Sequence, residues 1–224
     1  DVDAFDTSNL RNNQGGMVKD IEHIETLNGM RSNLLLKHAF NEGIKDSGLL
    51  ENDKLDRSRV GVSIGTSLGG YGGFIDLLYE NHYKKENKGE YESKLNEYNK
   101  LAPAEVIKNI PPVLLAYEIA DEYKFSGSIS SSITACSASA NALAMAYDLI
   151  NSGRTDYVIA GGVDPLSQLT YLGFNALMVM TKSELKTMDK NRSGLLIGEG
   201  AGSLILEKES SAIKRGAKIY ATFK

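Results

Sequence analysis

Short apolar runs rich in β-branched residues, each bordered by glycines, are the feature of this sequence that most limits its fold. The runs Arg59–Ile64 and Tyr157–Ala160 both end at glycines. A third run, Ser203–Glu207, follows a glycine-rich turn at 194–202. Runs of this length predict buried strands, and the glycines permit tight turns between a strand and a helix. Segments with helical spacing lie between the runs, and this alternation predicts an α/β fold.

Further elements follow from the same patterns. We expect additional strands at 128–135 and 219–223. Helical spacing predicts helices at 21–46, 74–83, 113–123 and 137–151, and a short helix that ends near Gly216. The helix at 137–151 is apolar on nearly all sides, so it should be buried. The segment 84–100, dense in Lys, Glu, Asn and Tyr, is interpreted as a solvated surface excursion.

Composition and charge narrow the class of protein. The 224 residues are 42% hydrophobic and 24% charged, which is enough for a sizeable core. The formal net charge of −4 gives no sign of a nucleic-acid binder, and no apolar run approaches the roughly 18 to 20 residues of a membrane span. The polar start, Asp1–Asn13, lacks the pattern of a signal peptide, and a single cysteine excludes an internal disulfide. We expect a soluble, cytoplasmic protein with no nucleic-acid or membrane partner.

Cys136 is the candidate catalytic residue, because it stands where the expected strand 128–135 meets the expected helix 137–151. The first turn of a helix has unpaired N–H groups and a partial positive charge, and both stabilise a thiolate. The same N–H groups can bind the oxyanion that forms when a thioester is attacked. The neighbours are small and allow a substrate to approach: Ala135, Ser137, Ala138 and Ser139. The position is compatible with a nucleophile, but by itself it is found more often with a buried cysteine that acts as a small hydrophobe, and the family resemblance described below reverses this order.

A catalytic cysteine commonly has an imidazole partner, but the three histidines of the chain do not suggest one. His23 and His38 lie in expected helices, and His82 precedes the charged excursion. None has a recognisable context, so all three are interpreted as ordinary histidines.

The glycine-rich segments do not match nucleotide-binding motifs. Gly65–Gly73 follows a strand but lacks the spacing of the dinucleotide fingerprint. Gly198–Gly202 lacks the Lys-Ser/Thr of a phosphate-binding loop. No cluster of Cys, His and carboxylate residues has metal-ligand spacing. We expect no bound cofactor and no metal.

Three segments together resemble the β-ketoacyl carrier-protein synthases, the condensing enzymes of fatty-acid and polyketide synthesis. Ser128–Leu143 (SISSSITACSASANAL) resembles the segment of the family's nucleophile. Asp156–Asp164 (DYVIAGGVD) resembles the strand and glycine pair that follow it, and Met188–Glu207 (MDKNRSGLLIGEGAGSLILE) resembles the Asp–Arg–Gly and Gly-Glu-Gly-Ala-Gly signature. Weaker similarities occur at FDTSNL and at Val60–Gly70 (VGVSIGTSLGG). The segments occur in the family's order and span almost the whole chain.

The resemblance implies a thiolase-like fold, with a mixed sheet and helices on both faces, and a 3-oxoacyl-[acyl-carrier-protein] synthase activity. The family's nucleophile corresponds to Cys136, which would accept an acyl group from a carrier-protein thioester. Malonyl-acyl-carrier protein would then lose carbon dioxide, and its carbanion would attack the acyl-cysteine to give 3-oxoacyl-acyl-carrier protein. The partner is an acyl carrier protein whose phosphopantetheine carries the substrates, and no separate cofactor is implied.

The resemblance also bears on domain organisation. We expect residues 1–224 to be the N-terminal domain of such a synthase, with the C-terminal half absent. The family's first strand, ahead of Asp3–Phe5, is absent too. The two catalytic histidines and a second oxyanion donor belong to the family's C-terminal half, so we expect no condensation by these residues alone. An apolar face should be left exposed.

Three departures from the family pattern concern the acyl pocket and the subfamily. Val113 stands where an asparagine is common, Ser193 replaces an acidic residue, and 177–186 is reduced and altered relative to common members.

Two other functions are compatible with the same fold. One is a non-catalytic ketosynthase-like subunit that shapes the pocket of an active partner, although such subunits typically lack the cysteine that Cys136 supplies. The other is a thiolase-type coenzyme A enzyme, which the Gly198–Gly202 signature disfavours. Family members are commonly homodimers that meet at the strand before the nucleophile, so Ser128–Ile133 is the expected dimer interface.

Overall fold

The computed structural model describes residues 2, 5, 7, 8, 10–21, 31–69, 71 and 111–223. The longer helices are α1 (Arg31–Asp46), α5 (Val113–Glu122), α6 (Ala138–Asn151), α7 (Gln168–Ala176) and α8 (Glu209–Lys214). The strands are β1 (Val60–Gly65), β2 (Ile129–Ser132), β3 (Tyr157–Asp164) and β4 (Gly200–Glu207). Three short 3-10 helices complete the described elements: η1 (Leu49–Glu51), η2 (Arg57–Arg59) and η3 (Ala135–Ser137).

The four strands form one mixed sheet in the order β2-β1-β3-β4. β1 pairs in parallel with β2 and with β3, so that Val62 lies beside Ile129 and Ile159. β4 runs antiparallel to β3, with Ala160 opposite Leu204. The carboxyl ends of the three parallel strands therefore meet at one edge of the sheet.

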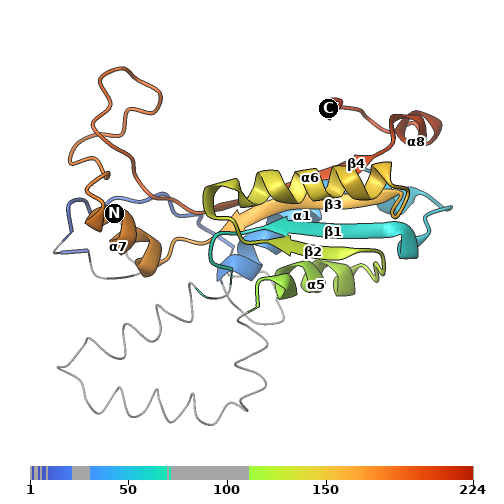
Figure 1. Ribbon diagram of the computed structural model, residues 1–224, viewed down its shortest axis with the longest axis horizontal. Helices are drawn as coiled ribbons and strands as arrows, with labels where there is room; N and C mark the ends of the chain where they lie inside the picture. The colour runs from blue at the N-terminus through green and yellow to red at the C-terminus, as the bar shows by residue number, and fades with distance from the viewer. Residues whose placement is uncertain are drawn as a thin grey trace, which may run out of the picture.

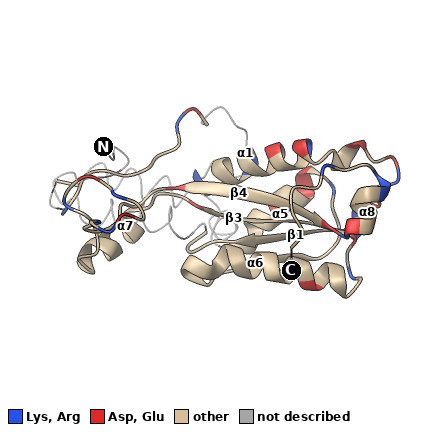
Figure 2. Ribbon diagram, turned by 90° about the horizontal axis from the view of Figure 1, so that it is seen from above, with Lys and Arg blue, Asp and Glu red and all other residues tan. Residues whose placement is uncertain are grey.

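Helices cover both faces of this sheet, as Figures 1 and 2 show. α6 packs on one face, while α1 and α5 pack on the other. All six residues of β1 are buried, as expected for a central strand covered on both faces. The main core lies between the sheet and α1 and α5; among its fully buried members are Leu36, Phe40, Ile64, Ile119 and Ile159. The predicted fold class, a mixed sheet with helices on both faces, is confirmed.

Most predicted elements within the described residues are confirmed, with shifted boundaries. The strand predicted at 128–135 is shorter, Ile129–Ser132, and the helix predicted from 21 begins, in the described part, at Arg31. α7 was not predicted from the sequence. The predictions for 74–83 and 84–100 lie outside the described residues. Within the described ranges no helix is both long and apolar enough to cross a bilayer.

The expectation that the helix at 137–151 is buried all round is wrong for this chain. α6 buries a single stripe, Ala138, Ala142, Ala146 and Ile150, at every fourth residue. Met145 and Tyr147, on other sides of the helix, keep more than a third of their surface exposed. Only one sheet face is available to this helix, and its other sides make partial contacts: Leu143 and Leu149 are partly buried against the core below α6, and the Tyr147 ring lies near that of Phe223. This agrees with the expected exposed apolar face.

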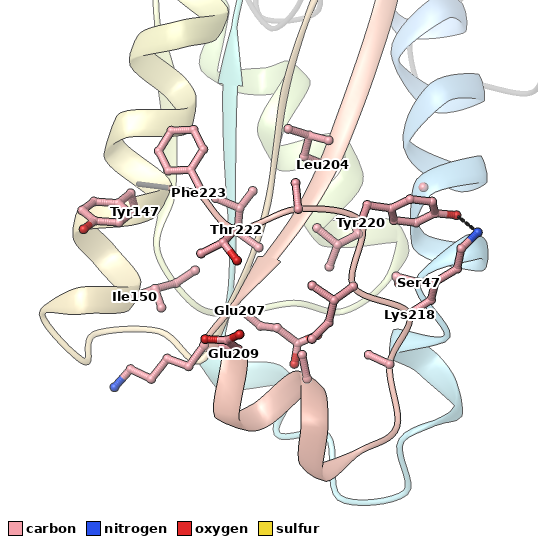
Figure 3. Close-up of a pocket in the computed structure, with 18 of the residues that line it drawn as sticks. Ser47, Tyr147, Ile150, Leu204, Glu207, Glu209, Lys218, Tyr220, Thr222 and Phe223 are labelled. Carbon is pink, nitrogen blue, oxygen red and sulfur yellow. Dashed lines mark hydrogen bonds between the residues drawn. The ribbon is translucent and has the colours of Figure 1, made fainter.

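The strand predicted at 219–223 is not formed. A strand needs a neighbouring backbone to pair with, and these residues have no strand conformation. The segment instead lines a pocket of about 490 Å³ beside β4 and α6 (Figure 3). The Phe223 ring lies 5.7 Å from the Tyr147 ring of α6. The segment is therefore held by side-chain contacts and not by the backbone hydrogen bonds of a strand.

The glycine pair at 161–162 was expected to end its strand, but β3 continues through both residues to Asp164. A Cβ on Gly161 would overlap the backbone of Gly202 on β4. The missing side chains serve close packing across the sheet rather than a turn.

Candidate active site

Cys136 lies at the edge of the sheet where the three parallel strands end. It follows β2 and lies within η3, which leads directly into α6. Cys136 is exposed, and it is the only cysteine of the chain. The region outside the carboxyl ends of parallel strands is where open α/β sheets usually bind ligands. The structure thus places the predicted nucleophile at the edge of the sheet suited to a substrate.

The backbone turns sharply at this cysteine. Ala135 has a φ of 51°, in the left-handed region that a residue with a Cβ adopts at a cost of about 1–3 kcal/mol. The turn is closed by Ser137, whose N–H and Oγ both donate to the carbonyl of Thr134, at 3.3 and 2.8 Å. Asn141, one turn into α6, donates through Nδ2 to Thr134 Oγ1 at 2.7 Å. A strained turn held by several hydrogen bonds is the backbone form of a nucleophile elbow.

Two glycines allow the first turn of α6 to rest directly on the strand ends. A Cβ on Gly65, the last residue of β1, would lie closer than 3.0 Å to the backbone of Ala138 and Ser139. A Cβ on Gly162 of β3 would overlap the side chain of Ser139 and lie 2.8 Å from the carbonyl oxygen of Gly65. The two glycines therefore set the distance between the sheet and the start of α6. Because Cys136 directly precedes this helix turn, they also set the position of the cysteine.

A carboxylate joins the ends of β1 and β3 beside this elbow. Asp164 Oδ1 accepts hydrogen bonds from Thr66 Oγ1 at 3.0 Å, from the Ser67 N–H at 2.7 Å and from Ser67 Oγ at 2.6 Å. The Gly69 N–H donates in turn to Thr66 Oγ1 at 2.9 Å. Sequence reasoning noticed Asp164 only as the end of a motif. The sequence nevertheless contained a signal for this contact, since Asp164 and the pair Thr66-Ser67 each stand at the end of a predicted buried strand.

A family model described as "Beta-ketoacyl synthase, N-terminal domain" matches residues 16–212. The chain belongs to this family. The resemblance inferred from the three sequence segments is confirmed.

Named relatives agree with this assignment. The 3-oxoacyl-[acyl-carrier-protein] synthase 2 of Synechocystis sp. is 31% identical, over 98% of this chain and 52% of that protein. The tetracenomycin polyketide synthase ketoacyl synthase alpha subunit of Streptomyces glaucescens is 30% identical, over 80% of this chain and 42% of that protein. The solved structure of the ishigamide ketosynthase/chain length factor superposes with a TM-score of 0.77 at 27% identity, over 97% of this chain and 52% of that one. The chain spans about half the length of these relatives, and its fold is thiolase-like, as predicted.

Glu199, in the family's Gly-Glu-Gly-Ala-Gly signature, is a buried carboxylate that connects three segments of the chain by hydrogen bonds. Its side chain is 1% exposed and pairs with Arg31 Nη2 at 2.6 Å. It also accepts hydrogen bonds from the N–H groups of Val18 and Leu166, at 2.8 and 3.1 Å. Burial by itself would raise the pKa of Glu199, but Arg31 and the two N–H groups outweigh it and hold the pKa below its ordinary value of 4.5. One carboxylate thus joins the N-terminal segment, α1 and the residues after β3.

The histidines do not gather around Cys136 in the described part of the chain. His38 lies exposed on α1, where its Nε2 is 3.9 Å from a Glu42 oxygen. His23 and His82 lie outside the described residues. Within the described ranges no group of three or more His, Cys, Asp or Glu side chains is arranged to hold a metal ion. The pocket of Figure 3 is not lined by Cys136, so it is separate from the candidate nucleophile.

All three noted departures lie within the described residues, and two of them are single side chains. Val113 is the first residue of α5 and is half-buried. Ser193, where the family pattern has an acidic residue, has its Oγ 2.6 Å from Thr181 Oγ1 and 3.2 Å from Ser183 Oγ. A small hydroxyl network stands at the position of the usual carboxylate.

Proposed function

We propose that this chain is the acyl-accepting part of a 3-oxoacyl-[acyl-carrier-protein] synthase, with Cys136 as the nucleophile. The Cys136 thiolate attacks a carrier-protein thioester, the acyl group moves to sulfur, and the phosphopantetheine thiol leaves. Malonyl-acyl-carrier protein then loses carbon dioxide, and its carbanion attacks the acyl-cysteine to give 3-oxoacyl-acyl-carrier protein and a free Cys136. This is the condensation step of fatty-acid or polyketide synthesis.

One observation carries the proposal. The exposed Cys136 stands on a strained strand-to-helix turn at the carboxyl edge of the parallel strands, in a chain that belongs to the β-ketoacyl synthase family. The N-terminal end of α6 carries the partial positive charge of the helix dipole, close to the place where the oxyanion would form. A non-catalytic subunit would need none of this, so the intact cysteine favours the enzyme.

The partner and the domain organisation are part of the same proposal. An acyl carrier protein delivers the substrates, in keeping with the name of the Synechocystis relative. Residues 1–224 form the N-terminal domain, and condensation needs catalytic histidines that these residues do not supply. β2 lies at the edge of the sheet, and Ile133 just after it is 54% exposed, which supports a homodimer that meets along Ser128–Ile133. The cytoplasm is the proposed compartment.

Intact-mass measurement tests the nucleophile directly. We expect the whole protein to gain one acyl group from an acyl thioester, or one adduct from a ketosynthase-directed epoxide, and Cys136→Ala to gain neither. Ser152→Ala, at the far end of α6 where its hydroxyl donates to the Leu149 carbonyl, is the matched control and should label like wild type. Equal labelling of wild type and Cys136→Ala would refute the assignment.

A second measurement concerns residues 1–224 by themselves. Incubated with acyl- and malonyl-carrier protein, they should form no 3-oxoacyl product. Product formed by the pure chain would show that the histidine roles were misplaced.

A further inference from the structure

Hydrogen bonds connect the ends of all three parallel strands to the turn that carries Cys136. Asp164, at the end of β3, receives three of them from Thr66 and Ser67, just after β1. The Thr66 N–H donates to the carbonyl oxygen of Ser132, the last residue of β2, at 3.0 Å. Ser132 Oγ lies 3.3 Å from Thr134 Oγ1, one residue before the strained Ala135.

The far side of the turn belongs to the same network. Thr134 Oγ1 also accepts from Asn141 Nδ2 of α6, and the Thr134 carbonyl accepts from Ser137. The strained conformation at Ala135 costs energy, so it persists only where surrounding contacts impose it. The network that imposes it begins at a single carboxylate oxygen, Asp164 Oδ1.

We propose that Asp164 is a positioning residue for Cys136: its carboxylate fixes the ends of the three strands, and thereby the turn on which the thiol stands. The inference rests on the proposed function, in which Cys136 is the nucleophile. Asp164 touches no reacting atom. It acts through Thr66, Ser132 and Thr134, which set the orientation of the turn relative to the N–H groups of α6.

Strand β3 supplies a matched control at its other end. Asp156, directly before Tyr157, accepts from Arg59 Nη2 at 2.9 Å and from Nε at 3.2 Å. It is therefore a second hydrogen-bonded aspartate, directly before the same strand and at the edge of the sheet away from Cys136. If the variants act only by weakening the strand, Asp164→Ala and Asp156→Ala should change the reactivity of Cys136 alike. If Asp164 positions the turn, only Asp164→Ala should change it.

The single cysteine makes the test specific, because iodoacetamide can alkylate only one thiol in the chain. The measurement is the ratio of the alkylation rate constant of the folded chain to that of the same chain unfolded in urea. Since Cys136 is already exposed, a looser turn cannot accelerate alkylation by uncovering it. The ratio therefore reports how well the turn aligns the thiol with the helix N–H groups.

We expect a ratio above one for wild type and for Asp156→Ala. Asp164→Ala should lower it at least about threefold, because a displacement of roughly 1 Å at a reacting group can change a rate by far more. Asp164→Asn keeps an acceptor oxygen and should restore the ratio to within about twofold of wild type. If Asp164→Ala fails to fold, Ser67→Ala, which removes the hydroxyl donor at 2.6 Å, replaces it with a smaller fall in the same direction.

A variant that loses stability in urea titration but keeps the wild-type ratio would overturn the positioning role. So would a wild-type ratio of one, or an equal fall in Asp156→Ala. Failure of the proposed function gives a different result. In that case wild type takes no acyl group from a thioester, while the alkylation ratio still falls in Asp164→Ala.

Discussion

Replacing Gly65 by alanine should lift the start of α6 from the sheet. The new methyl carbon would have to move roughly 1 Å from the Ala138 backbone to restore an ordinary contact of 3.4 Å. Both sides of this contact are backbone, the end of β1 and the first turn of α6, so no flexible side chain can yield. The helix must move as a unit or the strand must bend.

The magnitude follows from what such a movement loses. The Ala138 methyl group, now 2% exposed, would give up part of a burial worth about 0.8 kcal/mol. The buried hydrogen bond from Ser63 Oγ to the Ala142 carbonyl, 2.9 Å long, would be stretched at a cost of about 1 kcal/mol. Overpacking adds about 1–3 kcal/mol, and the reduced freedom of the unfolded chain returns about 0.5 kcal/mol. The net loss should be about 2–4 kcal/mol.

Urea denaturation followed by circular dichroism measures this loss, and the alkylation ratio of Cys136 should fall with it. Gly173→Ala is the control, because a Cβ at this exposed position of α7 meets nothing within 4 Å. It should be neutral or stabilise the fold by up to about 1 kcal/mol. A Gly65→Ala chain within about 0.5 kcal/mol of wild type would refute the claim that this glycine sets the height of the nucleophile helix.

Two further predictions concern charged pairs. Glu199→Gln should lower the free energy of unfolding at neutral pH by about 2 kcal/mol, because hydrogen bonds to charged groups contribute about 1.5–3 kcal/mol. Since folding lowers the pKa of Glu199, its contribution is complete above the ordinary value of 4.5 and is lost as the pH falls through the folded-state pKa. Urea titrations of wild type and variant should therefore converge in acid, and a gap that does not change with pH would contradict this. Arg215→Ala leaves the nearly buried Glu207 without its partner and should lower the free energy of unfolding by about 3 kcal/mol. Arg59→Ala removes one side of an exposed pair and should lower it by about 1 kcal/mol or less. Equal losses in urea denaturation would show that burial does not distinguish the two pairs.

The sequence predicted those parts of the fold whose signal is local. The β-branched runs became β1, β3 and β4, and the Cys136 turn was placed correctly between a strand and a helix. The segment 219–223 has an equally good strand pattern, but pairing depends on a neighbouring backbone, which a local pattern does not report. The same limit explains α6, whose all-round apolar pattern gives no indication of how many faces find partners.

The site was predicted in the same uneven way. Cys136 could be singled out because its position relative to two elements is a property of adjacent residues. The contribution of Asp164 depends on Thr66 and Ser67, which are about one hundred residues away in the chain and reach it only because β1 and β3 are neighbours. Gly65 and Gly162 could be placed at strand ends from the sequence, but which backbone each of them lies against depends on the three-dimensional arrangement.

The strand order has a consequence for how this domain folds. β1 is the central strand, and its Val62 pairs with Ile129 and Ile159, which follow it by 67 and 97 residues. Contacts so distant along the chain close slowly, because the entropy of a large loop is lost before any pairing compensates for it. During synthesis, β1 leaves the ribosome before either of its partners exists, and the backbone edge of β1 that pairs with β3 stays unpaired until β3 is complete. The thiol of Cys136 is made before β3, so it acquires its final setting only after residues that come later in the chain have joined the sheet.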